Sequence, residues 1–187
     1  MKTASFLEGQ LLLAMPSMAD ERFEQSVIYI CSHTEKGAMG LVINDVMSDI
    51  SFSELLKQLD ISVTSPIAEK TVHRGGPVEA GRGFVLHSAD YVQETTLVVS
   101  ETLALTATVD ILRAIANGTG PKNSLLALGY AGWGAGQLEK EMKNNSWLTA
   151  HAGEEIIFNT QTEDKWSRAI AMLGIDLSML SSESGHA

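Results

Sequence analysis

The chain has 187 residues, of which 44% are hydrophobic and 19% charged, and its formal net charge is −10. This length and composition predict a single globular domain spanning residues 1–187 and exclude a disordered chain. The acidic charge disfavours non-specific nucleic-acid binding and attachment to membrane surfaces, because both need clustered basic residues and the 13 lysines and arginines form no run.

The N-terminal part of the chain predicts a sheet that begins with a hairpin. β-Branched and aromatic residues favour a strand at 26–33, and further strands are expected at 9–15 and 38–44, with a turn at 34–37 between the last two along the chain. Ser51 and Glu54 form a capping-box pattern, which predicts the start of a short amphipathic helix.

The remainder of the chain adds strands and three more helices. Strands are expected at 72–77, 83–88, 96–100, 103–108, 124–130, 147–150 and 156–158. One helix is expected to be capped by Asp110, one to cover 137–143, and a last one to start near Thr162 and end at Gly174. Residues 180–187 are predicted to be a loose tail. Because strands outnumber helices and partly form hairpins, we expect an α+β fold with a mixed, largely antiparallel sheet and helices packed around it.

A glycine-rich turn separates the predicted strand 124–130 from the helix that follows. Gly132, Gly134 and Gly136 lack the G-x-G-x-x-G spacing of a dinucleotide site, but backbone N–H groups at a helix start can still hold an anion. The alternative is a tight turn covered by Trp133 and Trp147 as packed core residues.

A second candidate site lies between residues 72 and 88. It combines two histidines and two arginines with a glycine-rich backbone, and such groups bind carboxylates or phosphates. Its members are His73, Arg74, Gly75, Gly76, Arg82 and His87. The alternative is a hairpin in which the glycines serve turns and the arginines pair with carboxylates such as Glu79.

The lone cysteine, Cys31, is followed two residues later by His33, so on a regular strand both side chains would face the same way. A thiol beside an imidazole is the minimum for a cysteine nucleophile, yet no helix start lowers the thiol pKa, and a packed core thiol is favoured. No zinc-protease motif is present and His151 and His186 show no ligand spacing, so neither a metal nor a cofactor is expected. The single thiol and the absence of a signal peptide or membrane-spanning run favour a cytoplasmic protein.

Four stretches resemble the AlgH/YqgE family of bacterial proteins, in family order and over residues 9–173. They are GQLLLAMPSM (9–18), SVIYICSHTEKGAMGLVIN (26–44), HRGGPVEAGRGFVLHS (73–88) and LGYAGWGAGQLEKEMKNNSWL (128–148). Ser32 departs from the family pattern, in which a Glu precedes the His. The resemblance implies a single α+β domain whose sheet bifurcates and wraps into a pseudo-barrel. It implies little biochemistry beyond a label, in one branch, as a regulator of transcription.

We therefore expect a non-enzymatic binding or regulatory protein that acts through a protein partner or a small anionic ligand. Its predicted surface joins the 73–87 segment with Gly132, Trp133, Gly134 and Gln137. The alternative is an enzyme that uses His33, His73 or Arg74 in the same region. A sequence-specific DNA-binding protein ranks third, because of the acidic charge.

Overall fold

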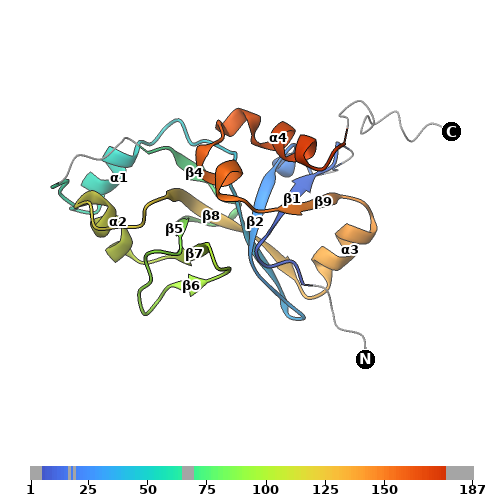
Figure 1. Cartoon of the computed structure of the whole chain (residues 1–187), viewed down its shortest axis with the longest axis horizontal. Coiled ribbons are helices and arrows are strands. Elements are labelled where there is room, and N and C mark those ends of the chain that lie inside the picture. The colour runs from blue at the N-terminus through green and yellow to red at the C-terminus, as the bar shows by residue number, and fades with distance from the viewer. Residues whose placement is uncertain (1–5, 17, 19, 65–69, 176–187) are drawn as a thin grey trace.

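The computed structural model describes residues 6–16, 18, 20–64 and 70–175, and the predicted tail at 180–187 lies outside this part of the chain. Within it, nine strands form one sheet with α-helices packed around it (Figure 1). The strands are β1 (Gln10–Ala14), β2 (Val27–Thr34), β3 (Gly37–Val42), β4 (Val72–Arg74), β5 (Val78–Ser88), β6 (Leu97–Val98), β7 (Leu103–Thr106), β8 (Ser124–Gly134) and β9 (Trp147–His151).

The sheet divides along β8, its long central strand. The strand order is β6-β7-β5-β8-β3-β2-β1-β9, and β4 pairs with β8 outside this path. One edge of β8 pairs with β5, while the other edge pairs first with β4, which runs parallel to it, and then with β3. The remaining strand pairs are antiparallel. The predicted mixed, largely antiparallel sheet that bifurcates is therefore confirmed.

The pairing of β4 and β5 corrects one sequence-based alternative. Val72 of β4 and Val85 of β5 both pair with Leu126 of β8, so the two strands lie on opposite edges of β8 and do not form a hairpin. The glycine-rich link crosses from one edge of β8 to the other. Gly76 has a φ of +155° there, and a Cβ at this position would overlap the Tyr130 backbone.

The sheet curls into a half-barrel around its main core. Residues from both ends of the strand order, such as Leu11 of β1 and Leu103 of β7, pack into one cluster with Trp166 and Ile170. Trp166 and Ile170 belong to α4 (Lys165–Met172), which covers this concave side, and the Trp166 indole N–H donates to the Ala14 carbonyl over 2.9 Å. Neighbouring residues of β8 face opposite clusters, so this strand is covered on both faces, as its continuous apolar run at 124–130 predicts.

The other helices cover the convex side at its two ends (Figure 1). α1 (Phe52–Gln58) and α2 (Val109–Ala116) pack against β5 and β8, and α3 (Gln137–Lys143) packs against β1, β2 and β3. The predicted helix start at Ser51 is confirmed, because the Ser51 hydroxyl caps α1 by accepting the Glu54 backbone N–H over 3.1 Å. Asp110 was wrongly predicted as a cap: Thr108 is the cap residue of α2 and Asp110 lies in its first turn.

Two predictions near the C-terminus are also corrected. The apolar run at 156–158 is no strand but lies in a π-helical turn, Glu155–Asn159, which buries Ile156 and Ile157 against the main core. A short apolar run is compatible with either geometry, and here tertiary packing decides. The last helix begins at Lys165, after a 3-10 turn at Thr162–Asp164. No helix in the described part of the chain has the length and apolarity to cross a bilayer.

Candidate functional site

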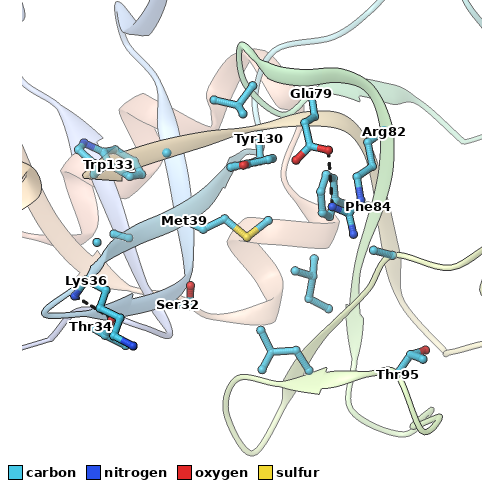
Figure 2. Close-up of a pocket in the computed structure, with 17 residues that line it drawn as sticks. Ser32, Thr34, Lys36, Met39, Glu79, Arg82, Phe84, Thr95, Tyr130 and Trp133 are labelled. Atoms are coloured by element: carbon cyan, nitrogen blue, oxygen red, sulfur yellow. Dashed lines mark hydrogen bonds and ion pairs between the residues drawn. The ribbon is translucent and has the colours of Figure 1, made fainter. Parts of the chain in front are cut away.

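An open groove of about 680 Å³ lies on the concave side of the sheet, towards the Trp133 end of β8 (Figure 2). We call it the sheet groove. It is lined by Ser32, Thr34, Lys36, Gly37, Ala38, Met39, Val78, Glu79, Arg82, Phe84, Thr95, Leu97, Leu105, Ala107, Tyr130, Gly132 and Trp133. Its volume falls within the range of small-molecule sites.

The floor of the sheet groove is apolar and aromatic. Met39 of β3, Phe84 of β5 and Tyr130 of β8 approach one another from three neighbouring strands (Figure 2). The rings of Phe84 and Tyr130 meet edge to face, with centroids 5.7 Å apart. Leu97 on the edge strand β6 extends this wall and is 45% exposed, so apolar surface remains open to solvent here.

Two cations and one carboxylate stand at the rim of the sheet groove. The Arg82 guanidinium lies 5.1 Å above the centre of the Phe84 ring and 3.7 Å from a Glu79 carboxylate oxygen. Lys36 is exposed in the turn between β2 and β3, where its backbone N–H donates to the Thr34 hydroxyl over 3.1 Å. An exposed ion pair of this kind is weak, so Arg82 can exchange Glu79 for another anion at little cost.

A bulge in β5 brings Glu79 and Arg82 to this place. The register of β5 on β8 shifts between Val78 and Gly83, and Glu79 adopts a φ of +48°. The bulge passes over Gly129 of β8, whose φ is +78° and where a Cβ would press against the Gly76 carbonyl oxygen. Bulges commonly re-aim side chains, and this one directs an ion pair over the groove.

The glycine-rich turn after β8 has a structural explanation. Trp133 and Trp147 pack edge to face with centroids 6.1 Å apart, and both indole N–H groups donate to the same Glu141 oxygen over 3.0 and 2.9 Å. Gly136 supplies the left-handed backbone, φ +75°, that starts α3. Glycine and tryptophan therefore occur together because the chain must turn sharply above two indoles that share one carboxylate.

The turn also bears on the predicted anion site. The Gly134 N–H donates to the Gln137 side-chain oxygen over 3.0 Å, and the Gln137 amide donates to Glu141 over 2.9 Å. Gln137 and Trp133 line a second hollow of about 400 Å³, which Pro77 of the glycine-rich link also reaches. The two predicted segments therefore do meet, but the Gly134 N–H and the Gln137 side chain are engaged with each other within the turn.

The other predicted site residues are divided among several places. Arg82, Gly132 and Trp133 line the sheet groove, whereas Arg74 and Gly76 line a hollow of about 310 Å³ beside Asp45. Arg74 lies 3.6 Å from an Asp45 carboxylate oxygen. Gly75 is packed so closely against the Gly129 carbonyl that no side chain would fit there.

The two histidines of the second segment are both buried, away from the groove. The Nδ1 of His87 lies 2.8 Å from the Ser88 carbonyl oxygen, and its Nε2 lies 2.8 Å from the Thr106 hydroxyl. Burial lowers the pKa of His87. His73 lines a separate cavity at the opposite end of β8. The structure thus does not unite His73, Arg74 and His87 in one pocket.

The favoured interpretation of Cys31 as a packed core thiol is confirmed, whereas the expectation that Cys31 and His33 face the same way is wrong. The register of β2 on β3 shifts between Ile30 and Ser32, so the alternation of side chains changes at Cys31. Cys31 points into the main core, and burial raises its pKa to about 12. The His33 ring faces the other side, where its Nδ1 accepts the Leu7 N–H over 3.0 Å and its Nε2 lies 3.3 Å from Glu139, without hydrogen-bond alignment.

Sequence reasoning missed the apolar part of the groove, namely Met39, Phe84 and Tyr130. These residues are ordinary strand residues in the sequence, and only their position around one groove of a curled sheet distinguishes them. A signal was available for two of them, because Phe84 and Tyr130 each follow a glycine that loosens the strand.

The chain is similar to known proteins over nearly its whole length. The sequence pattern described as AlgH-like matches residues 11–178. The chain belongs to the AlgH-like family. A UPF0301 protein of Rhodospirillum rubrum is 53% identical over 186 residues, covering 100% of this chain and 97% of the relative. A UPF0301 protein of Rhodopseudomonas palustris is 54% identical over 191 residues, covering 97% and 87%.

Two solved structures share the fold of this AlgH-like protein. The solution structure of the AlgH protein from Pseudomonas aeruginosa has a TM-score of 0.78 and 45% identity, with 100% of both chains covered. A crystal structure of a Corynebacterium diphtheriae protein has a TM-score of 0.76 at 22% identity, with 97% and 95% covered, and it supports the fold alone.

Proposed function

We propose that this protein is a binding or regulatory protein that takes a small organic anion with an apolar body into the sheet groove. The observation that carries the proposal is the meeting, in one cavity, of the aromatic floor at Phe84 and Tyr130 with the cations Lys36 and Arg82 at the rim. A concave, mostly apolar site with a few convergent polar groups is the usual form of a ligand site.

The charge distribution supports an anionic ligand. The chain carries a formal net charge of −10, yet the lining of the groove contributes two cations and one carboxylate. An arginine binds a carboxylate through two parallel hydrogen bonds, and its stacking on Phe84 holds the guanidinium in place for this contact. A ligand carboxylate at Arg82 would leave an apolar body lying over Phe84 and Tyr130.

The composition of the lining supports binding over catalysis. A nucleophilic enzyme needs a hydroxyl or thiol hydrogen-bonded to a base, with a third group that orients the base. The described lining offers the hydroxyls of Ser32, Thr34, Thr95 and Tyr130 but no histidine or cysteine beside them. A cytoplasmic location is part of the same proposal and is supported by the single buried thiol, Cys31.

Native mass spectrometry of freshly purified protein tests the proposal directly. We expect a bound small molecule in the wild type that is lost, or at least tenfold less occupied, in Arg82→Met. Arg113→Met is the matched control, because Arg113 is an exposed arginine on α2 outside the groove and its loss changes the net charge equally.

A second measurement uses simple probes if purification strips the ligand. Benzoate, indole-3-acetate and octanoate are titrated while the backbone NMR signals of β3, β5 and β8 are followed. Shifts confined to groove residues, and absent in Arg82→Met, support the proposal. A second polypeptide in the mass spectrum would instead indicate a protein partner. Probes that leave the groove signals unmoved would contradict small-ligand binding in the groove.

A further inference from the structure

A cavity of about 270 Å³ lies at the Ser124 end of β8, where β4, the π-helical turn and the start of α4 meet. We call it the lysine pocket. Its lining is Lys70, Thr71, His73, Ser124, Leu125, Ile157, Phe158, Asn159, Thr160, Gln161, Thr162 and Lys165. The lysine pocket shares no lining residue with the sheet groove, so the inference below is independent of the proposed function.

The lysine pocket is cationic in an acidic protein. Two of its lining residues are lysines and none is an aspartate or glutamate, although the whole chain has 23 acidic residues. Lys165 is only 2% exposed, and burial lowers its pKa to about 8, so the ammonium group is largely charged at neutral pH. Among the described residues no carboxylate compensates this buried charge, which is a costly arrangement.

The Lys165 ammonium has donors to spare. Its Nζ donates to the Ile43 carbonyl oxygen over 2.8 Å, and this is its one hydrogen bond to the described residues. An ammonium group carries three N–H donors. The side chain is held in place by the Ile43 contact, and its remaining donors are available to a ligand in the pocket.

His73 presents the opposite property, a buried lone pair. Its Nδ1 lies 3.1 Å from the Leu126 carbonyl oxygen, which can only accept, so Nδ1 carries the proton. Burial, followed by the charge of Lys165, lowers the His73 pKa to about 4, so the ring is neutral and Nε2 is a bare acceptor. His73 is 5% exposed, and its Nε2 is buried with no hydrogen-bond partner in the described structure.

Lys165 and His73 would each form a different kind of hydrogen bond with a ligand in the pocket. The ammonium of Lys165 needs an anionic oxygen, whereas Nε2 of His73 needs a hydrogen-bond donor. We propose that the lysine pocket binds a small oxyanion that keeps an O–H group at neutral pH, of which hydrogenphosphate and hydrogencarbonate are the common examples. Its charged oxygens accept from Lys165 and its O–H donates to His73.

The same logic predicts selectivity against sulfate. Sulfate matches phosphate in size and charge but carries no proton at neutral pH, so it would place an acceptor oxygen against the His73 lone pair. The hydroxyls of Thr71, Ser124 and Thr162 can serve either anion, because a hydroxyl donates or accepts. Discrimination therefore depends on the neutral His73.

Calorimetric titration of the full chain at pH 7 and constant ionic strength tests this inference. Sodium phosphate, sodium bicarbonate and sodium sulfate are the probes. We expect phosphate or bicarbonate to bind at least about tenfold more tightly than sulfate, the factor that corresponds to one unmade hydrogen bond at a buried acceptor. Whichever of the two binds more tightly identifies the oxyanion.

Variants localise the binding. Lys165→Met should weaken phosphate or bicarbonate binding at least about tenfold, since a charge-assisted hydrogen bond is lost. Lys140→Met, which removes an exposed charge from α3, should leave it within about twofold. Lys70→Met is the second variant at the pocket and replaces the first if Lys165→Met fails to fold.

The wild-type protein supplies a readout without mutation. The ¹⁵N signal of His73 Nε2 should move on addition of the preferred anion, while that of exposed His151 should not. Equal affinity for sulfate and phosphate, or an unmoved Nε2 signal at saturation, would overturn the inference. Absence of binding by both phosphate and bicarbonate would overturn it as well, and none of these results bears on the sheet groove.

Discussion

Buried polar groups have hydrogen-bond partners at one end of β8 and lack some of them at the other. At the Trp133 end, the Glu141 carboxylate accepts two indole N–H groups and the Gln137 amide. At the Ser124 end, Lys165 has one hydrogen bond and the Nε2 of His73 has no partner in the described structure. The first arrangement stabilises the fold, whereas the second costs stability and is explained best by a ligand.

The same contrast separates the two cavities. The sheet groove is open, with an aromatic and apolar floor, and its charged residues are exposed at the rim. The lysine pocket is smaller, and two of its charged or titratable side chains are more than nine-tenths buried. Charge in a buried site contributes more to recognition than charge at an exposed rim, because water screens the exposed group.

The largest effect is expected from Glu141→Ala at the Trp133 end. The substitution leaves two largely buried indole N–H groups without an acceptor, so we expect a loss of about 2–4 kcal/mol in the free energy of unfolding. Urea denaturation followed by tryptophan fluorescence measures it. Lys140→Ala on the same helix is the control, and a loss no larger than in this control would mean that Glu141 is not the structural centre of the turn.

The next effect concerns acid pH at the Ser124 end. The pKa of His73 is about 4 in the folded protein and about 6.5 when unfolded, so the unfolded chain binds the proton first as pH falls. Stability from this group is complete above pH 6.5 and is lost between pH 6.5 and 4, by about 2–3 kcal/mol at pH 4.5.

Comparison of wild type with His73→Gln isolates this contribution. Unfolding is measured at pH 7 and pH 4.5 in buffer without phosphate or bicarbonate. The variant should lose less stability than the wild type on acidification, while His151→Gln, at an exposed position, should behave like the wild type. Identical pH dependence in all three proteins would show that the imidazole of His73 is not held neutral by the fold.

A smaller effect, of opposite sign, is expected for Lys165→Met. Removing a buried charge and keeping the apolar volume should leave the unfolding free energy unchanged or raise it by about 1 kcal/mol at pH 7. Urea denaturation without added anion measures the change. A loss above about 2 kcal/mol would instead assign Lys165 a structural role through its bond to Ile43.

The last prediction is that the protein does not bind DNA. The cations at the two ends of β8 lie in separate cavities on a chain of net charge −10, so no continuous basic surface is expected. Fluorescence anisotropy with a random duplex at physiological salt should show no binding. Micromolar affinity with a steep salt dependence would contradict this expectation and would support direct binding to DNA as a regulator of transcription.

Local patterns in the sequence determined most of the elements. The β-branched and aromatic residues in 26–33, the turn at 34–37 and the capping residue Ser51 specify their elements through contacts between near neighbours. The apolar run at 124–130 likewise indicated a central strand covered on both faces, because such a strand has no solvent side. The family resemblance, confirmed by the match over residues 11–178, pointed to the same fold.

Tertiary structure alone decided which side chains share a cavity. His73 and Arg74 are neighbours in sequence but line different hollows, because successive residues of β4 point to opposite faces. Lys165 reaches Ile43 from 122 positions away, and no sequence spacing predicts that contact. The bulge at Cys31 reversed the expected facing of His33 for the same reason: one extra residue changes every side chain beyond it, and only the pairing with β3 reveals it.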